Sequence, residues 1–282
     1  MSFNSLVRIC LFGAALVGSC AASAELPQPV LKPDPNNLTV GLGVAMAPTY
    51  EGSDDYALTQ AVLVRGQVAG FSFFSRGTAL YLDLAREQPN APIDLLIGPM
   101  ANLRFDRSMA IKDRPVRRLG KLDTAIEAGA FVGIGRSGLL NPYDYAMVRF
   151  DLVKDVSGTH RGFIMTPNLE YGTPLSRKTY IGANLSADYV DGDFARTYYT
   201  VDAPGRVRSG LRRFDARSGF KNARLTLLGT QRVTGDLTSK GLGVFLVGSY
   251  SRMLGSFADS PLVRDAGSRN QYFAAAGLTY SF

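Results

Sequence analysis

The chain has 282 residues, a formal charge of +7, two cysteines and one histidine. After the N-terminal region, no stretch approaches the roughly 18 uninterrupted apolar residues that a transmembrane helix needs. Helical membrane proteins are therefore excluded, whereas secreted soluble proteins and outer-membrane barrels remain.

Residues 1–24 are predicted to be a cleaved secretory signal peptide. Arg8 supplies the positive charge, residues 9–17 form a short apolar core, and Ala22-Ser23-Ala24 is a small-x-small cleavage site. Cleavage before Glu25 removes Arg8 as the one charged residue of this segment, so the charge falls from +7 to +6.

The two cysteines, Cys10 and Cys20, both lie in this segment. Cleavage leaves no cysteine, which excludes disulfides and thiolate metal sites. The alternative is that Cys20, in a sequence loosely similar to a lipoprotein box, is lipidated instead of removed. Residues 25–37 are rich in proline and are predicted to form an extended leader.

From residue 38 onward, apolar and polar side chains alternate with the two-residue period of β-strands. Many alternating segments run ten residues or more, and their polar faces hold Gly, Asn, Asp and Arg. This pattern favours an all-β fold, a single transmembrane antiparallel β-barrel of about 12 strands over residues 38–282, with 10 to 14 as the range. The predicted strands are 38–46, 59–68, 77–86, 93–106, 121–136, 143–155, 161–172, 178–190, 196–202, 220–233, 240–254 and 271–282.

Connection lengths predict the orientation, because periplasmic turns are short and external loops are long. With a periplasmic N-terminus, the long connections 47–58, 203–219 and 255–270 face outward. The short connections 156–160, 191–195 and 234–239 face the periplasm. One connection breaks the rule, since 107–120 is long and is predicted to be periplasmic.

That connection carries a basic cluster, which is a candidate periplasmic interaction site for an anionic partner. The alternative is a solvated run of charges. Its residues are Arg114, Arg117, Arg118 and Lys121. The external loop 203–219 is also basic and lies where lipopolysaccharide phosphates are found, so charge-assisted contacts are expected there. Nucleic acid is not an expected partner in this compartment.

Charged residues of both signs fall on the predicted inner face of the strands. They either pair across a narrow lumen or line a small pore, and pairing is favoured because buried charges are costly when unpaired. The candidate lumen-lining residues are Arg65, Asp83, Arg104, Asp106, Asp123, Glu127, Arg149, Asp151, Glu170, Asp188, Arg224 and Arg232.

His160, the only histidine, is predicted to be a solvated residue of a short periplasmic turn. A metal site would need more His or Cys ligands, and a hydrolase would need a nucleophile beside the histidine on the lumen wall. We therefore expect no catalytic residue, no metal and no cofactor.

The last strand alternates to the final residue. Even positions from Tyr272 to Phe282 are expected to face lipid, and Gly277, Thr279 and Ser281 to face the lumen. Pairing with strand 38–46 would close the sheet, which removes the open edge that a membrane forbids. Tyr280 and the terminal Phe282 are candidate signals for the barrel assembly machinery.

Four stretches together resemble the MipA/OmpV family of outer-membrane proteins. Residues 40–56 carry a Pro-x-Tyr-x-Gly-Ser loop, 186–201 a Tyr-Tyr-x-Val region, and 254–282 the sequence Asp-Ser-Pro before the last strand. The loop 209–220 is also similar, although it is richer in arginine than expected. The resemblance spans nearly the whole mature chain.

The resemblance implies a Gram-negative outer-membrane barrel without enzymatic activity. It also implies a scaffold linked to peptidoglycan remodelling, with a murein lytic transglycosylase and a murein synthase as partners. Two alternatives are kept: a porin-like, narrow passive channel for small solutes, including small antibiotics, and, less favoured, a barrel enzyme.

Overall fold

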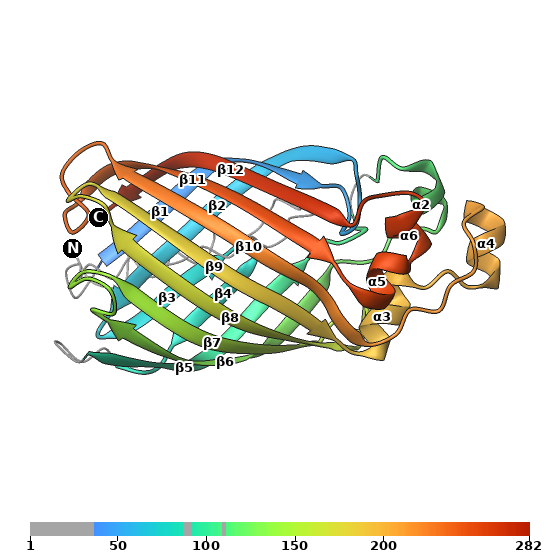
Figure 1. The fold of residues 1–282 in the computed structure, drawn as a ribbon, viewed down its shortest axis with the longest axis horizontal. Coiled ribbons are helices and arrows are strands. Elements are labelled where there is room, and N and C mark those ends of the chain that lie inside the picture. The colour runs from blue at the N-terminus through green and yellow to red at the C-terminus, as the bar shows by residue number, and fades with distance from the viewer. Residues whose placement is uncertain (1–36, 87–91, 109–110) are drawn as a thin grey trace, which may run out of the picture.

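The computed structural model describes residues 37–86, 92–108 and 111–282. Over these residues, twelve antiparallel strands close into one barrel (Figure 1), each paired with its neighbours in chain order. The predicted signal peptide, the leader up to residue 36 and Cys20 lie outside the described residues. The strands are β1 (Asn37–Pro48), β2 (Tyr56–Val68), β3 (Phe71–Arg76), β4 (Ala79–Asp83), β5 (Ile93–Arg104), β6 (Ala125–Ser137), β7 (Tyr145–Asp155), β8 (Phe163–Pro174), β9 (Thr179–Val190), β10 (Gly219–Arg232), β11 (Gly241–Met253) and β12 (Asn270–Ser281).

Short helices occupy the connections between strands. They are α2 (Arg114–Arg118), α3 (Gly192–Tyr199), α4 (Ala203–Ser209), α5 (Gly255–Asp259) and α6 (Pro261–Arg264). None of the helices in the described part of the chain is long and apolar enough to cross a membrane.

The outer face of the strands is apolar and exposed. Leu42, Leu227 and Leu246 are 64, 54 and 63% exposed, and each alternates with inward-facing residues. Exposed leucines in regular rows would be costly in water, but they suit contact with lipid acyl chains. The predicted transmembrane barrel is confirmed.

Strands β1 and β12 close the barrel, as predicted. Val40 pairs with Tyr280, Leu42 with Leu278, and Gly43 with Gly277. The two glycines permit this close approach, because a Cβ on Gly277 would lie 2.3 Å from the Leu42 carbonyl oxygen and 2.6 Å from the Phe245 ring. Phe245 covers the glycine pair from inside the lumen, a known way to stabilise strand glycines.

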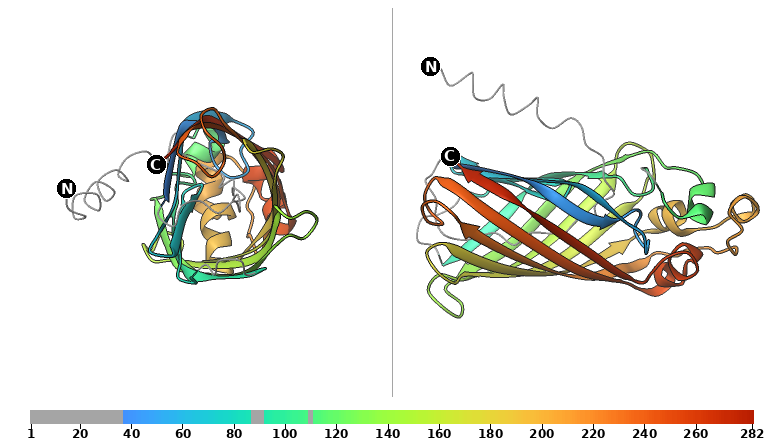
Figure 2. Two further views of the ribbon diagram at one scale, coloured as in Figure 1. Left: turned by 90° about the vertical axis from the view of Figure 1, so that its left-hand side faces the viewer. Right: turned by 90° about the horizontal axis from the view of Figure 1, so that it is seen from above.

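The two ends of the barrel differ. At the terminal end, where β1 begins and β12 ends, the connections are 69–70, 84–92, 138–144, 175–178 and 233–240. At the opposite end, which we call the lid end, the connections 105–124, 191–218 and 254–269 carry all five helices of the described residues (Figures 1 and 2). Outer-membrane barrels usually have short periplasmic turns and long external loops, so the terminal end is assigned to the periplasm and the lid end to the outside.

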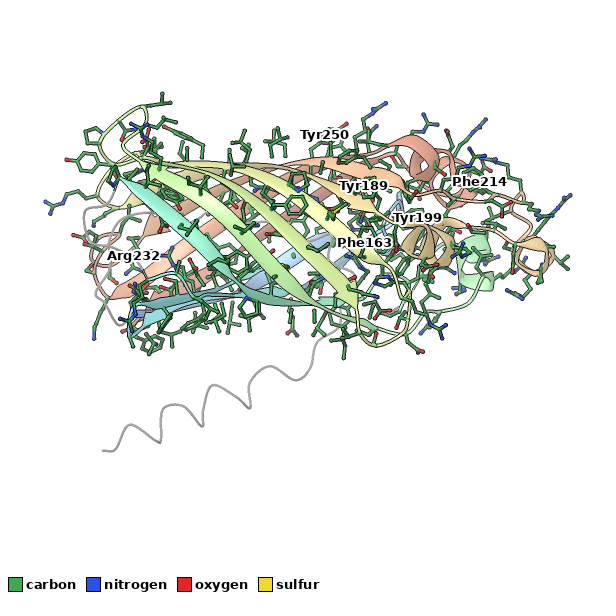
Figure 3. All side chains as sticks on the ribbon, turned by 90° about the horizontal axis from the view of Figure 1, so that it is seen from below. Phe163, Tyr189, Tyr199, Phe214, Arg232 and Tyr250 are labelled. Carbon is green, nitrogen blue, oxygen red and sulfur yellow. The ribbon has the colours of Figure 1, made fainter. Side chains whose placement is uncertain are left out.

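Aromatic side chains ring the outer wall near both ends. Tyr189 packs on Phe220, and Tyr250 on Tyr272, each with ring centroids 5.5 Å apart. Tyr189 and Tyr250 are labelled toward the lid end in Figure 3. Tyr280 and Phe282 form a matching pair at the terminal end. Such aromatic belts mark the two membrane interfaces.

The prediction missed one strand, β3, and placed a strand over residues 196–202 where the structure has helix α3. One strand too few and one too many leave the predicted count of twelve unchanged. Strand β3 was missed because it is only six residues long between tight turns, with positive φ angles at Gly70 and Gly77. The predicted strand 196–202 is instead mostly part of helix α3. Its aromatic and β-branched residues favour a strand by propensity, but Asp191 accepts a hydrogen bond from the Phe194 N–H and caps a helix.

These errors reverse the predicted sides of several connections. Because β3 is missing from the predicted order, each predicted strand between β3 and α3 crosses the membrane in the opposite direction to the observed strand. The connection 107–120 therefore lies at the lid end, so its length no longer breaks the rule. The connections 156–160 and 191–195, predicted at the periplasmic side, also lie at the lid end.

Candidate functional site: the filled lumen and its lid

Helix α3 closes the lid end from inside. Its Asp191 cap turns the chain inward, and the helix buries Phe194, Ala195, Tyr198 and Tyr199, each at most 1% exposed. Seen along the barrel axis, α3 lies within the barrel outline (Figure 2), and Figure 3 places Tyr199 at this end. The Phe194 and Tyr198 rings pack 4.7 Å apart, so the helix acts as an aromatic plug.

Tyr50 fastens the β1–β2 connection to the β11–β12 connection. Its hydroxyl donates to the Leu262 and Ala266 carbonyls at 3.0 and 2.8 Å. The neighbouring Gly52 has φ = +102°, and its carbonyl accepts from the Ser268 N–H. Burial raises the pKa of Tyr50, which keeps the hydroxyl protonated as a donor.

Arg107 and Ser260 fasten the remaining connections. The Arg107 guanidinium, almost fully buried, donates to the Tyr198 and Gly120 carbonyls at 3.4 and 3.1 Å. The Ser260 hydroxyl donates to the Tyr199 carbonyl at 2.7 Å. The three motifs that resemble the MipA/OmpV family (Pro-x-Tyr-x-Gly-Ser, Tyr-Tyr-x-Val and Asp-Ser-Pro) thus meet in one place, where they hold the lid together.

Below the plug, Glu127 on β6 is the centre of a buried polar cluster. Arg104 Nε lies 2.6 Å and His160 Nε2 3.0 Å from its Oε1, and Asn102 donates to its Oε2 at 2.7 Å. Because the Gly162 N–H donates to His160 Nδ1, Nε2 is the ring nitrogen left to donate to Glu127.

The prediction of a solvated His160 was therefore wrong. The side chain is buried against Phe194 and Tyr198 because the β7–β8 connection folds inward at the lid end. Both ring nitrogens are engaged, so neither is placed to take a proton from a nucleophile.

A second cluster crosses the middle of the lumen. Glu170 on β8 accepts from Arg76 at 2.8 Å and from Arg149 at 2.7 Å. Arg149 also pairs with Asp151 at 2.7 Å, and Tyr81 donates to Asp151 at 3.0 Å. Arg76 and Arg149 are each 1% exposed. Such buried pairs hold the wall in one arrangement, because removing one partner leaves the other charge buried and unpaired.

A third cluster joins the wall to the lid. Lys221 on β10 lies 2.7 Å from Glu51 and 3.2 Å from Asp188, and Arg224 lies 3.6 Å from Asp188. Burial opposes ionisation of Glu51, but the Lys221 ammonium holds the pKa of Glu51 below its usual value. Burial and the Glu51 charge raise the pKa of the adjacent Asp106, which accepts from the Glu51 N–H.

These side chains leave a cavity of about 80 Å³ among the three clusters. That volume suits a few water molecules. Its wall carries both signs of charge, including Glu51, Asp106, Arg76 and Lys221. Among the described residues, no three His, Cys, Asp or Glu side chains are grouped to hold a metal ion.

The other predicted lumen residues have varied positions. Arg65 is half-buried on β2, and Asp83 on β4 accepts the Ile97 N–H. Arg232 on β10 donates to the Asp236 and Ser239 carbonyls of the 233–240 turn at the terminal end (Figure 3). Asp123 is exposed in the β5–β6 connection, so its predicted lumen position was wrong, because β6 begins only at Ala125.

Sequence reasoning missed several interior groups, namely Glu51, Arg76, His160 and Lys221. Arg76 was missed together with β3. Lys221 falls beside a register shift between Phe220 and Asn222, so simple alternation assigns it to the wrong face. Glu51 and His160 lie in connections, where strand periodicity carries no signal.

The predicted interaction residues Arg114, Arg117, Arg118 and Lys121 lie together on and beside α2, and all four are exposed. Their periplasmic placement depended on the wrong strand parity. These residues lie at the lid end, opposite the terminal end where β1 begins and β12 ends.

The lipid-facing wall, the closed sheet and the two aromatic belts define a β-barrel protein of the outer membrane, here with a side-chain-filled lumen. Residues 40–282 match the model of the family described as MltA-interacting protein MipA. The chain belongs to this family.

Solved barrels of similar fold include the toluene transporter TodX of Pseudomonas putida, at 8% identity and a TM-score of 0.38 over 93% of this chain and 96% of that chain. Another is OprD of Pseudomonas aeruginosa, at 9% identity and a TM-score of 0.34 over 94% of this chain and 97% of that chain. Identities and scores this low carry no argument about transport. The comparison with curated proteins finds no match.

Proposed function

We propose that this protein is a non-enzymatic interaction barrel of the outer membrane. The observation that carries the proposal is the filled lumen. Three buried polar clusters surround a cavity of about 80 Å³, and helix α3 fills the lid end with buried aromatic side chains. A barrel filled in this way acts through its surfaces rather than through an active site or an open pore.

The family description, MltA-interacting protein, supports a murein lytic transglycosylase as one partner. A murein synthase in the same assembly is part of the proposal through the resemblance of the sequence motifs. A periplasmic partner approaches the terminal end. There the connection 138–144 presents Leu140 and Tyr143, which are 77 and 66% exposed. Asp144 holds this loop by accepting the Leu139 and Leu140 N–H groups at 2.7 and 2.8 Å, so the exposed side chains are pre-positioned for docking.

The test is capture of a purified murein lytic transglycosylase by the refolded barrel. The double variant Leu140→Asp/Tyr143→Asp is expected to lose capture. The double variant Arg117→Ala/Arg118→Ala, at the opposite end, is expected to retain it. Loss with the arginine variant alone would move the partner surface to the lid end, and no capture by the wild type would remove the transglycosylase as a direct partner.

A narrow passive channel is the second candidate, favoured by the polar lumen wall. Planar-bilayer recording separates the two candidates. The interaction barrel predicts no steady unitary conductance in the wild type. A steady conductance that changes on Arg149→Gln substitution would instead support the channel.

A further inference from the structure

The net charge of the chain is concentrated in two segments of the lid end. Residues 111–123 hold five basic and two acidic residues, and residues 200–217 hold the same numbers. Together they contribute +6 of the total +7, which leaves the other 251 residues at +1. Electrostatically, the rest of the protein is almost balanced, and the lid end carries the excess.

The two segments are built alike. Each contains the sequence Asp-x-Pro-x-Arg, from Asp113 to Arg117 and from Asp202 to Arg206. In both, the aspartate accepts a backbone N–H three residues later, at 2.9 and 2.6 Å, and so caps a short helix, α2 or α4. Proline near the start of each helix fits its first turn.

The two helices form one surface, which we call the basic crown. Val116 and Leu119 of the α2 segment pack in one apolar cluster with Val201 and Leu211 of the α4 segment. Gly205 leaves room for this contact, since a Cβ there would lie 3.2 Å from Leu119 Cδ2. Figure 1 shows the crown beyond the lid-end termini of the strands, farthest from the terminal end.

The crown charges are exposed and largely unneutralised. Arg212 pairs with Asp265 at 3.1 Å. Within the described ranges, the other crown cations have no acidic side chain at ion-pair distance, unlike the paired charges of the lumen. These residues are Lys112, Arg114, Arg117, Arg118, Lys121, Arg206, Arg208, Arg213 and Arg217.

We propose that the basic crown binds the phosphorylated sugar region of lipopolysaccharide outside the membrane. Arginine, which supplies most of the crown, matches phosphate oxygens with its planar, two-pronged donors. The crown extends beyond the aromatic belt at Tyr189 and Tyr250 (Figure 3), so it faces the sugars above the membrane plane rather than the acyl chains. The crown therefore matches the phosphorylated sugars in charge, positive against negative, and in height above the membrane.

The test measures binding of the detergent-solubilised, folded barrel to immobilised lipopolysaccharide with an intact phosphorylated core, and to the same material after enzymatic dephosphorylation. The variant Arg117→Gln/Arg118→Gln/Arg206→Gln/Arg208→Gln removes four crown charges from exposed positions. The control Arg177→Gln/Lys178→Gln/Lys240→Gln removes exposed charges from the terminal end. Heat-modifiable migration verifies that every variant is folded.

The wild type and the control are expected to bind in a salt-dependent manner, whereas the crown variant loses affinity by roughly tenfold or more. Dephosphorylation is expected to produce a similar loss. Equal binding by the crown variant and the wild type overturns the proposal, as does undiminished binding to dephosphorylated material. This outcome is independent of transglycosylase capture, which is tested at the other end.

Discussion

At the terminal end, consecutive strands are joined by turns as short as 69–70, and the side chains there are held by local contacts such as those of Arg232 with carbonyls of the 233–240 turn. At the lid end, four connections distant in sequence interlock through Tyr50, Arg107 and Ser260. Strand pairing alone therefore explains the terminal end. The lid end needs specific side chains, and it carries nearly all of the net charge.

The largest effect is expected from the terminal end. Deletion of Phe282 removes the last aromatic residue, whose backbone N–H donates to the Leu38 carbonyl at 2.9 Å and whose ring packs on Tyr280. We expect the amount of folded barrel in the outer membrane to fall severalfold, measured by heat-modifiable migration of membrane fractions. The substitution Phe282→Tyr, which keeps an aromatic ring, should restore it. Normal levels of the deletion would refute an assembly role.

Glu127→Ala should have the next largest effect. It leaves buried Arg104 without its carboxylate and His160 without its acceptor. Loss of one member of a buried ion pair costs about 3–5 kcal/mol. The free energy of unfolding, from urea titration in detergent followed by circular dichroism, should fall by this amount. Asp123→Ala, at an exposed position in the same region, should change it by less than about 0.5 kcal/mol. Similar values for both would contradict a structural role for the cluster.

Tyr50→Phe should loosen the lid without unfolding the wall. The change removes a hydroxyl that donates to two carbonyls and leaves those carbonyls buried, at a cost of about 1–3 kcal/mol. Faster trypsin cleavage within 254–269 is expected, with the β-sheet signal unchanged. Tyr143→Phe, exposed at the terminal end, serves as the matched control, and equal cleavage of the two variants would argue against the fastening role of Tyr50.

The smallest effect is a pH dependence confined to the lid end. Because the pKa of Glu51 is lowered in the fold, its stabilising contribution is complete above the usual value of 4.5 and is lost as pH falls through the folded pKa. The raised pKa of Asp106 has the opposite sign, since its contribution is complete below 3.8 and is lost as pH rises through the folded pKa.

The protection of residues 49–55 against hydrogen exchange, corrected for the slower intrinsic exchange in acid, should therefore fall in acid through loss of the Glu51–Lys221 pair. The protection of the 175–178 turn should show no comparable step. Glu51→Gln should flatten this response. An unchanged acid response in the variant would assign it to another group.

Alternation with a period of two determined most of the fold, because each wall residue faces either lipid or lumen and the two environments select different side chains. It placed β12 against β1 and located most of the interior charges, including Arg149, Glu170 and Asp188. The resemblance to the MipA/OmpV family, not the alternation, identified the motifs around Tyr50, Tyr199 and Ser260, but it gave no structural reason for them.

Tertiary structure alone decided the rest. Helix α3 overrides a strand-favouring sequence because its cap and its buried aromatic face fit the barrel mouth. The short β3 strand and the register shift beside Lys221 changed the sides of connections and residues, which local periodicity cannot detect. His160 and Glu51 became interior partners only because connections fold back into the lumen, and such long-range packing leaves no periodic trace in the chain.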